Sequence, residues 1–108
     1  MVLWRGAFGL LPSEREIVWR LPLSYGDVRK LELQVWDGAS LLKREELMFP
    51  TGISSEPTSK LTMSRGPHRA VMIVSVAGAS APLSYTVDFD PRDDATIVVT
   101  APKPVAGH

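Results

Sequence analysis

Residues 61–76, LTMSRGPHRAVMIVSV, give the clearest indication of the fold, because two apolar segments flank a turn. Leu61 and Met63 alternate with polar residues, which is the period of two typical of a half-buried β-strand. Residues 65–67, Arg-Gly-Pro, then interrupt the pattern with two residue types that favour turns. Residues 70–76 are apolar at every second position and nearly so between, which indicates a central strand covered on both faces. The stretch therefore predicts two consecutive strands joined by a tight turn.

Outward from this stretch the same alternation recurs, and we expect further strands over residues 14–21, 31–35, 83–89 and 97–100. In these segments one face carries apolar residues and the other carries polar ones. Trp19, Tyr85 and Phe89 fall on the apolar faces of their strands, so we predict that they lie in the core. The 3.6-residue period of an amphipathic helix is hard to find along the chain.

Asp37-Gly38 is the strongest hairpin signal, because a type I′ turn needs positive φ at both central positions. A turn centred there pairs Trp36 with Ala39 and predicts a strand over residues 39–48, ASLLKREELM. The register that follows gives three opposite-charge pairs and one apolar pair: Lys30 with Glu45, Glu32 with Lys43, Arg29 with Glu46 and Leu33 with Leu42. A helix over residues 39–48 with Ser40 as its cap is the alternative, since these residues are good helix formers.

Seven short strands in a chain of 108 residues bury one core most simply as an all-β, antiparallel, two-layer β-sandwich without a substantial helix. The strand, Gly-containing turn and long apolar strand of residues 61–76 resemble the element found in immunoglobulin-like and transthyretin-like (prealbumin-like) sandwiches. The resemblance implies the fold and no activity, because such sandwiches host many unrelated functions.

The chain divides into a sandwich domain over residues 12–100 and two flanking segments. Residues 1–11, MVLWRGAFGLL, are apolar but shorter than the about 20 residues of a membrane-spanning helix. They could form an extra edge strand, an arm that docks into a protein partner or a second copy, or the remnant of a signal or anchor. The composition of residues 101–108, APKPVAGH, predicts a flexible Pro-containing tail. Residues 49–59 are predicted to form the most mobile loop.

Charge and cysteine content exclude several classes of function. Lys plus Arg and Asp plus Glu both number 12, so the net charge is zero, which argues against a nucleic-acid binder and a polybasic membrane-surface protein. The absence of cysteine excludes disulfides, thiolate metal sites and cysteine nucleophiles. Eight Arg against four Lys indicate a bacterial source. The sequence does not decide the compartment: the protein would be periplasmic if a signal was removed and cytoplasmic otherwise.

Four carboxylates around one turn are the weak candidates for a metal site: Asp88, Asp90, Asp93 and Asp94. Calcium prefers several oxygen ligands, which alternate carboxylates can supply. The spacing lacks the glycine and the closing Glu of an EF-hand loop. A strand end followed by an Asp-Pro turn, in which Asp side chains bond nearby backbone N–H groups, is therefore the favoured interpretation. His68 is expected to be a solvated turn residue rather than a general base, and no cofactor is expected.

Five large apolar residues are the candidates for partner binding: Trp4, Phe8, Leu10, Leu11 and Trp36. The first four lie in the segment 1–11 that a seven-strand core does not require, and exposed apolar patches usually mark interfaces. The parity of Trp36 places it on the charged face of its strand, where it could stack on a sugar or a partner, or lie under a neighbouring loop. These features predict a non-enzymatic interaction or structural module, such as an envelope-associated accessory domain or a subunit of a larger bacterial assembly. A small sandwich that binds carbohydrate or calcium is the alternative.

Overall fold

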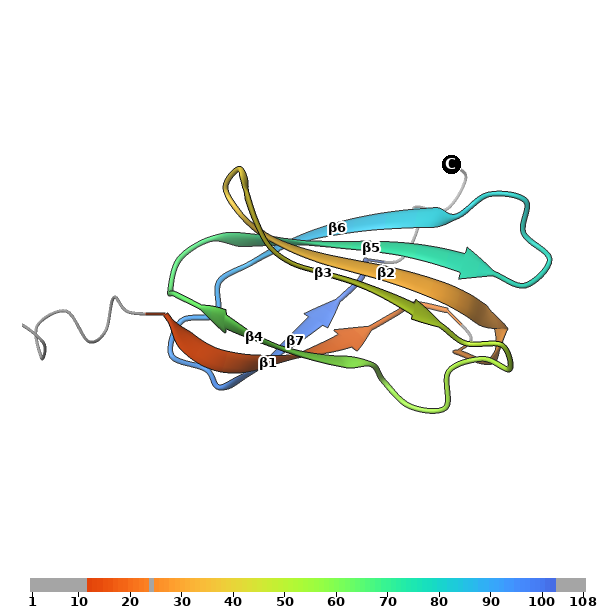
Figure 1. Ribbon diagram of the computed structural model, residues 1–108, viewed down its shortest axis with the longest axis horizontal. Helices are drawn as coiled ribbons and strands as arrows, with labels where there is room; N and C mark the ends of the chain where they lie inside the picture. The colour runs from red at the N-terminus through yellow and green to blue at the C-terminus, as the bar shows by residue number, and fades with distance from the viewer. Residues whose placement is uncertain (1–11, 24, 103–108) are drawn as a thin grey trace, which may run out of the picture.

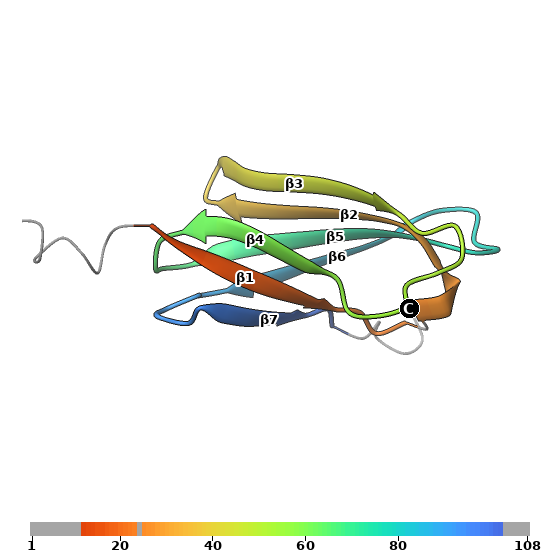
Figure 2. The ribbon, with the colours of Figure 1, turned by 60° about the horizontal axis from the view of Figure 1, so that its bottom comes forward.

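A computed structural model describes residues 12–23 and 25–102, which form seven strands in two layers (Figures 1 and 2). The strands are β1 (Ser13–Arg20), β2 (Val28–Asp37), β3 (Ser40–Met48), β4 (Thr58–Met63), β5 (His68–Val76), β6 (Leu83–Phe89) and β7 (Thr96–Thr100). The one helical element among the described residues is a 3-10 turn over Tyr25–Asp27. The all-β, seven-stranded prediction is therefore confirmed, and residues 40–48 form a strand rather than the alternative helix.

The strands are divided between a three-stranded sheet, in the order β4-β1-β7, and a four-stranded sheet, in the order β3-β2-β5-β6. In Figure 1 the four-stranded sheet lies above the three-stranded sheet. Neighbouring strands are antiparallel except for β1 and β7, which run parallel, so the sandwich is not antiparallel throughout. In the constant-type immunoglobulin arrangement the first, second, fourth and fifth strands share one sheet. Here β2 and β5 lie in the opposite sheet from β1 and β4, so the layers match that resemblance and the strand order does not.

The core fills the space between the sheets with the inward residues of each strand. On β1 burial alternates along the strand, and Ile17 and Trp19 are fully buried. Tyr85 of β6 is buried and Phe89 is partly buried against the core, so the core positions predicted for the aromatic residues are confirmed. On β5 the inward residues are buried, but the outward Val71 and Ile73 are only half-buried. The prediction that β5 is covered on both faces is therefore wrong for the described residues.

The hairpin of β2 and β3 has a different register from the one predicted. Gly38 has φ +57°, and among the non-glycine residues that the structure describes only Arg92 has a positive φ. A positive φ at the first central position alone is the type II′ pattern, so the two-residue turn is Gly38-Ala39 and not Asp37-Gly38. Asp37 pairs with Ser40, and Trp36 opposes Leu41 instead of Ala39.

A β-bulge between Val35 and Trp36 shifts the register again. Val35 opposes Lys43 and Trp36 opposes Leu41, which leaves Leu42 as the extra residue of β3. The predicted ion pairs are consequently replaced: Glu32 opposes Glu46, and Lys30 opposes Met48. Bulges let two residues of one strand oppose one of the partner strand. The bulge thus places both leucines opposite the single side chain of Trp36.

Two polar residues near one end of the sandwich, His68 and Arg15, point inward. For His68 this contradicts the prediction. His68, the first residue of β5, is 4% exposed, so it is not the solvated turn residue that the sequence indicates. Its Nδ1 lies 2.8 Å from the carbonyl oxygen of Gly66, and its ring packs against that of Phe89. Arg15 of β1 is also buried, and it donates to the carbonyl oxygens of three residues that are distant in sequence, Met63, Pro91 and Asp94.

The segment between β3 and β4 is irregular, as predicted, but it is anchored. Ile53 is buried, and its N–H donates to the carbonyl oxygen of Tyr25 at 2.9 Å. Gly52 has φ +92°, and a Cβ added there would lie 2.5 Å from the carbonyl oxygen of Gly26. The two backbones therefore meet at a distance that only glycine allows. We infer from these contacts that this loop is held against the 3-10 turn.

Both flanking segments extend beyond the described part of the chain. Residues 1–11, with the candidates Trp4, Phe8, Leu10 and Leu11, lie outside the described residues, as do residues 103–108. Ala101, placed in the tail by the sequence, is buried and donates its N–H to the carbonyl oxygen of Arg20 at 2.9 Å. Within residues 12–23 and 25–102, no helix has the length and apolarity needed to cross a membrane.

Candidate functional site

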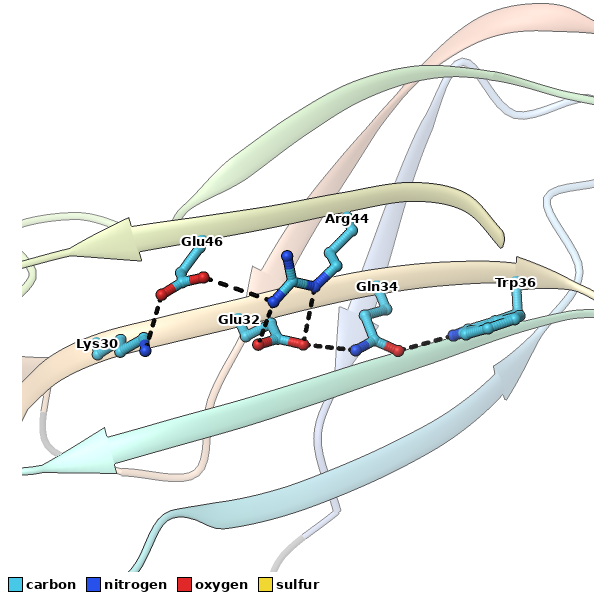
Figure 3. Close-up of polar contacts among 6 residues, drawn as sticks. All are labelled: Lys30, Glu32, Gln34, Trp36, Arg44 and Glu46. Atoms are coloured by element: carbon cyan, nitrogen blue, oxygen red, sulfur yellow. Dashed lines mark hydrogen bonds and ion pairs between the residues drawn. The ribbon is translucent and has the colours of Figure 1, made fainter. Parts of the chain in front are cut away.

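The outer face of the four-stranded sheet carries an ordered row of polar side chains along β2 (Figure 3). Glu32, Gln34 and Trp36 occupy alternate positions of the strand and therefore point to the same side. The indole N–H of Trp36 donates to Oε1 of Gln34 at 2.9 Å. The amide of Gln34 in turn donates to Oε2 of Glu32 at 2.6 Å. Trp36 thus lies on the charged face that its parity predicts, half-buried and held in one orientation.

Arg44 of β3 joins this row to the neighbouring strand. Its Nε and Nη2 lie 3.2 and 3.0 Å from the two carboxylate oxygens of Glu32, which is a bidentate arrangement. Nη2 also lies 3.5 Å from Glu46, whose other oxygen lies 2.8 Å from Nζ of Lys30 (Figure 3). We call the resulting network of Lys30, Glu32, Gln34, Trp36, Arg44 and Glu46 the ladder. The ladder connects the outward side chains of β2 and β3, and none of its charged groups is fully buried.

The ladder shifts the protonation equilibria of its central pair. Hydrogen bonds from Arg44 and then from Gln34 lower the pKa of Glu32, and partial desolvation opposes them. The carboxylate of Glu32 raises the pKa of Arg44 through the same hydrogen bonds and charge attraction. The Glu32 side chain is 17% exposed, so the pair is partly shielded from solvent. The carboxylate of Glu32 therefore stays ionised to a lower pH than that of an ordinary glutamate.

We expect the substitution Arg44→Met to raise the pKa of Glu32, because it removes the largest cause of the lowering. In the wild type, stability that depends on this pair is complete above the ordinary glutamate pKa of about 4.3 and is lost as the pH falls through the lower folded value. NMR titration of the Glu32 carboxyl carbon measures the titration midpoint in the wild type and in Arg44→Met. Gln34→Ala is the matched control and should raise the midpoint less. An unchanged midpoint in Arg44→Met would contradict the role assigned to Arg44.

Exposed apolar side chains gather around the ladder. The described residues include five exposed large hydrophobics, and three of them lie on β3: Leu41 (44% exposed), Leu42 (40%) and Met48 (66%). The bulge places the two leucines beside Trp36 at one end of the ladder, and Met48 lies opposite Lys30 at the other. We call the ladder together with Leu41, Leu42 and Met48 the hairpin face. Its layout is apolar at both ends and charged in the middle.

The carboxylates predicted as metal candidates are not gathered into one site. Asp88 pairs with Arg69, at 3.1 Å, and Asp93 pairs with Arg65. Asp90 accepts the N–H groups of Arg92 and Gly66, which lower its pKa. Among the described residues no group of three or more His, Asp or Glu side chains could hold a metal ion. The Asp-Pro turn interpretation is thus supported by the bonds of Asp90.

A depression of about 600 Å³ lies at the tip of the hairpin, lined by Asp37, Gly38, Pro67, His68, Arg69 and Asp88. The ion pair of Arg69 and Asp88 neutralises part of its rim. Nε2 of His68 is buried and has no hydrogen-bond partner among the described residues. Nδ1 of His68 is bonded to the carbonyl oxygen of Gly66, and no described side chain with a nucleophilic atom is bonded to its ring.

Sequence reasoning found Trp36 but missed most of the hairpin face. The alternation of Glu32, Gln34 and Trp36 was sufficient to place these three on one side. The partner strand could not be added, because its register depends on the position of the turn and on the bulge. No family model, no curated protein and no solved structure matches this chain.

Proposed function

We propose that this chain is a non-enzymatic protein-interaction module and that the hairpin face is its binding surface. The observation that carries the proposal is that three of the five exposed large hydrophobic residues in the described part of the chain lie on β3, around the ladder. A module of this kind would act as an accessory domain or subunit of a larger assembly. The proposal rests on the sandwich and its outer face, and it does not depend on an immunoglobulin-like or transthyretin-like relationship.

The composition of the hairpin face matches what protein interfaces favour. Interface centres are enriched in Trp, Met and Arg, and a few such residues supply most of the binding energy. Trp36 and Arg44 are held by hydrogen bonds before any partner arrives. Binding then has less side-chain entropy to remove, since these two groups are already ordered. The hairpin face is therefore prepared for contact rather than only exposed.

The edge of β3 is less suited to binding than its outer face. Lys43 and Glu45 lie at inward positions of β3, opposite Val35 and Leu33. Lys43 donates to the carbonyl oxygen of Lys60, and Ser59 donates to Glu45. Both inward charged side chains of β3 are therefore hydrogen-bonded to β4 in the other sheet. Inward charges and bulges are the devices by which natural edge strands resist the addition of another strand. We therefore expect a partner to lie on the face and not to extend the sheet.

A photo-crosslinking residue at Leu41 tests the proposal in cells that express the full chain. We expect one dominant crosslinked protein, which mass spectrometry identifies and which is then purified. Calorimetric titration of the pair should show binding that Leu41→Asp weakens by about tenfold or more. Val98→Asp, at a similarly exposed apolar position on the other sheet, is the control and should bind as the wild type does. Equal binding by wild type and Leu41→Asp would overturn the proposal.

Carbohydrate binding is the second candidate, because Gln34 holds the Trp36 ring on a flat face among polar side chains. Aromatic rings with polar neighbours can stack on a sugar and bond its hydroxyl groups. A glycan array separates the two candidates. Binding that Trp36→Ala abolishes and Leu41→Asp preserves would favour the carbohydrate function. The calcium alternative has less support, since the carboxylates of Asp88, Asp90 and Asp93 have other partners.

A further inference from the structure

β7 is an edge strand that lacks the usual protection against pairing. Among the described residues its only neighbour in the sheet is β1, so its other side presents free backbone N–H and C=O groups. Its sequence, TIVVT, contains no charge and no proline. Ile97 and Val99 point into the core, and Val98, which is 48% exposed, points outward. β7 therefore combines strong β-propensity with an open edge.

The other three edge strands carry charged residues, and the edges of β3 and β4 are hydrogen-bonded to each other. β3 has inward Lys43 and Glu45, and Nζ of Lys43 donates to the carbonyl oxygen of Lys60 on β4 at 2.6 Å. β6 carries Asp88, which is paired with Arg69. Edge charges oppose the approach of a further strand. β7 is thus the one edge strand of the described sandwich without any charged residue.

β7 is also complementary to itself. When two copies of TIVVT run antiparallel about a twofold axis perpendicular to the sheet, Thr96 opposes Thr100, Ile97 opposes Val99, and Val98 opposes Val98. Such an axis keeps inward residues with inward residues, so both cores continue across the contact. On β3, by contrast, a twofold centred at Arg44 or Glu45 places like charges directly opposite, which is destabilising.

The geometry points to a second copy of this chain as the occupant of the β7 edge. Two copies joined in this register form one continuous six-stranded sheet, β4-β1-β7-β7-β1-β4. The contact is isologous and uses the single β7 of each copy, so it closes as a dimer and does not propagate. The dimer brings the two outward Val98 side chains into contact with each other, and it leaves the hairpin face of each copy free. It is therefore independent of the proposed function.

Sedimentation velocity of the full chain tests the dimer. We expect a species of twice 11.8 kDa that dissociates on dilution. Val98→Lys should give a monomer, because two ammonium groups would meet at the twofold axis while the exposed position leaves the fold intact. Val98→Thr keeps a β-branched residue and should remain a dimer, as should Leu41→Lys on the hairpin face. A dimer that persists in Val98→Lys, or that is lost in Leu41→Lys, would overturn the inference.

A cysteine at the axis tests the register, since the chain has no native cysteine. Directly opposite Cβ atoms lie about 4.5–5.5 Å apart, close to the separation that a disulfide needs. Under mild oxidation Val98→Cys should form a disulfide-linked dimer, and Thr62→Cys on β4 should not. Hydrogen exchange gives a further arm. A monomer in which the outer-edge amides of β7, those not bonded to β1, are protected would overturn the inference in favour of residues 1–11 of the same chain. A monomer in which these amides exchange freely would overturn it outright.

Discussion

Replacing Trp19 with Ala is expected to lower the free energy of unfolding by about 3–5 kcal/mol, the range for large aromatic residues removed from a core. Among the described residues Trp19 is the largest fully buried side chain, and it lies in β1, the central strand of its sheet. The total stability of a domain is typically about 5–15 kcal/mol. The variant should therefore be marginally folded or unfolded at ambient temperature, as measured by urea denaturation followed by circular dichroism.

The loss has a polar component besides the cavity. The indole N–H of Trp19 donates to Oγ of Ser59 at 2.8 Å, and Ser59 donates to Glu45 of β3. This chain of bonds links the two sheets at the edge where β3 and β4 meet. Trp19→Phe removes the bond but retains most of the ring, so it should cost less than Trp19→Ala.

Trp36→Ala is the matched control, because it removes the same side chain from a half-buried position on the outer face. It should cost about 1–2 kcal/mol, since only part of the ring leaves a protected site. If Trp19→Ala and Trp36→Ala were equally stable, the assignment of Trp19 to the core and of Trp36 to the surface would be wrong.

Replacing Arg15 with Met is expected to destabilise the domain by about 2–4 kcal/mol, because buried acceptors would lose their donors. The guanidinium donates to the carbonyl oxygens of Met63 (3.1 Å), Pro91 (3.3 Å) and Asp94 (2.8 Å). These carbonyls belong to the end of β4 and to the loop between β6 and β7. A single side chain of β1 thus ties together three segments that approach one end of the sandwich.

The control for Arg15→Met is Arg20→Met on the same strand. Arg20 pairs with Glu56 at 2.6 Å, but its side chain is 52% exposed, and exposed ion pairs contribute about 1 kcal/mol or less. Arg15→Lys should lie between the wild type and Arg15→Met, since an ammonium retains the charge and loses the planar fork of donors. Thermal unfolding measures all three. A cost for Arg15→Met no larger than that for Arg20→Met would show that these bonds add nothing beyond an exposed pair.

The strands of this protein could be predicted from local sequence, because alternation and turn residues act over a few positions. The expected strand at residues 83–89 agrees with β6, and that at 97–100 begins one residue after β7 does. Pairing between strands is not local. The parallel pair of β1 and β7 left no signal in either segment, and the shift of the hairpin turn from Asp37-Gly38 to Gly38-Ala39 changed every partner of β3.

The candidate site shows the same division. Trp36 could be placed on the polar face by parity alone. Leu41 and Leu42 could not be placed beside it, because the bulge puts an extra residue opposite Trp36, which a strict period of two does not allow. His68 was expected to be a solvated turn residue, and nothing in the local sequence indicated that Arg15 would be buried. Their inward positions depend on carbonyl groups and a ring that belong to other turns and strands.

The parallel pairing of β1 with β7 also constrains the order of events when the chain is made. Glu16 pairs with Thr96, so the three-stranded sheet is complete only after β7 has left the ribosome. The β2–β3 and β5–β6 hairpins need only nearby residues and can form early, since closing short loops costs little entropy. Until β4 and β7 have been synthesised, β1 has no neighbouring strand, and its apolar side with Trp19 is exposed. We expect this interval to be the period in which the nascent chain is most prone to aggregate and most dependent on chaperones.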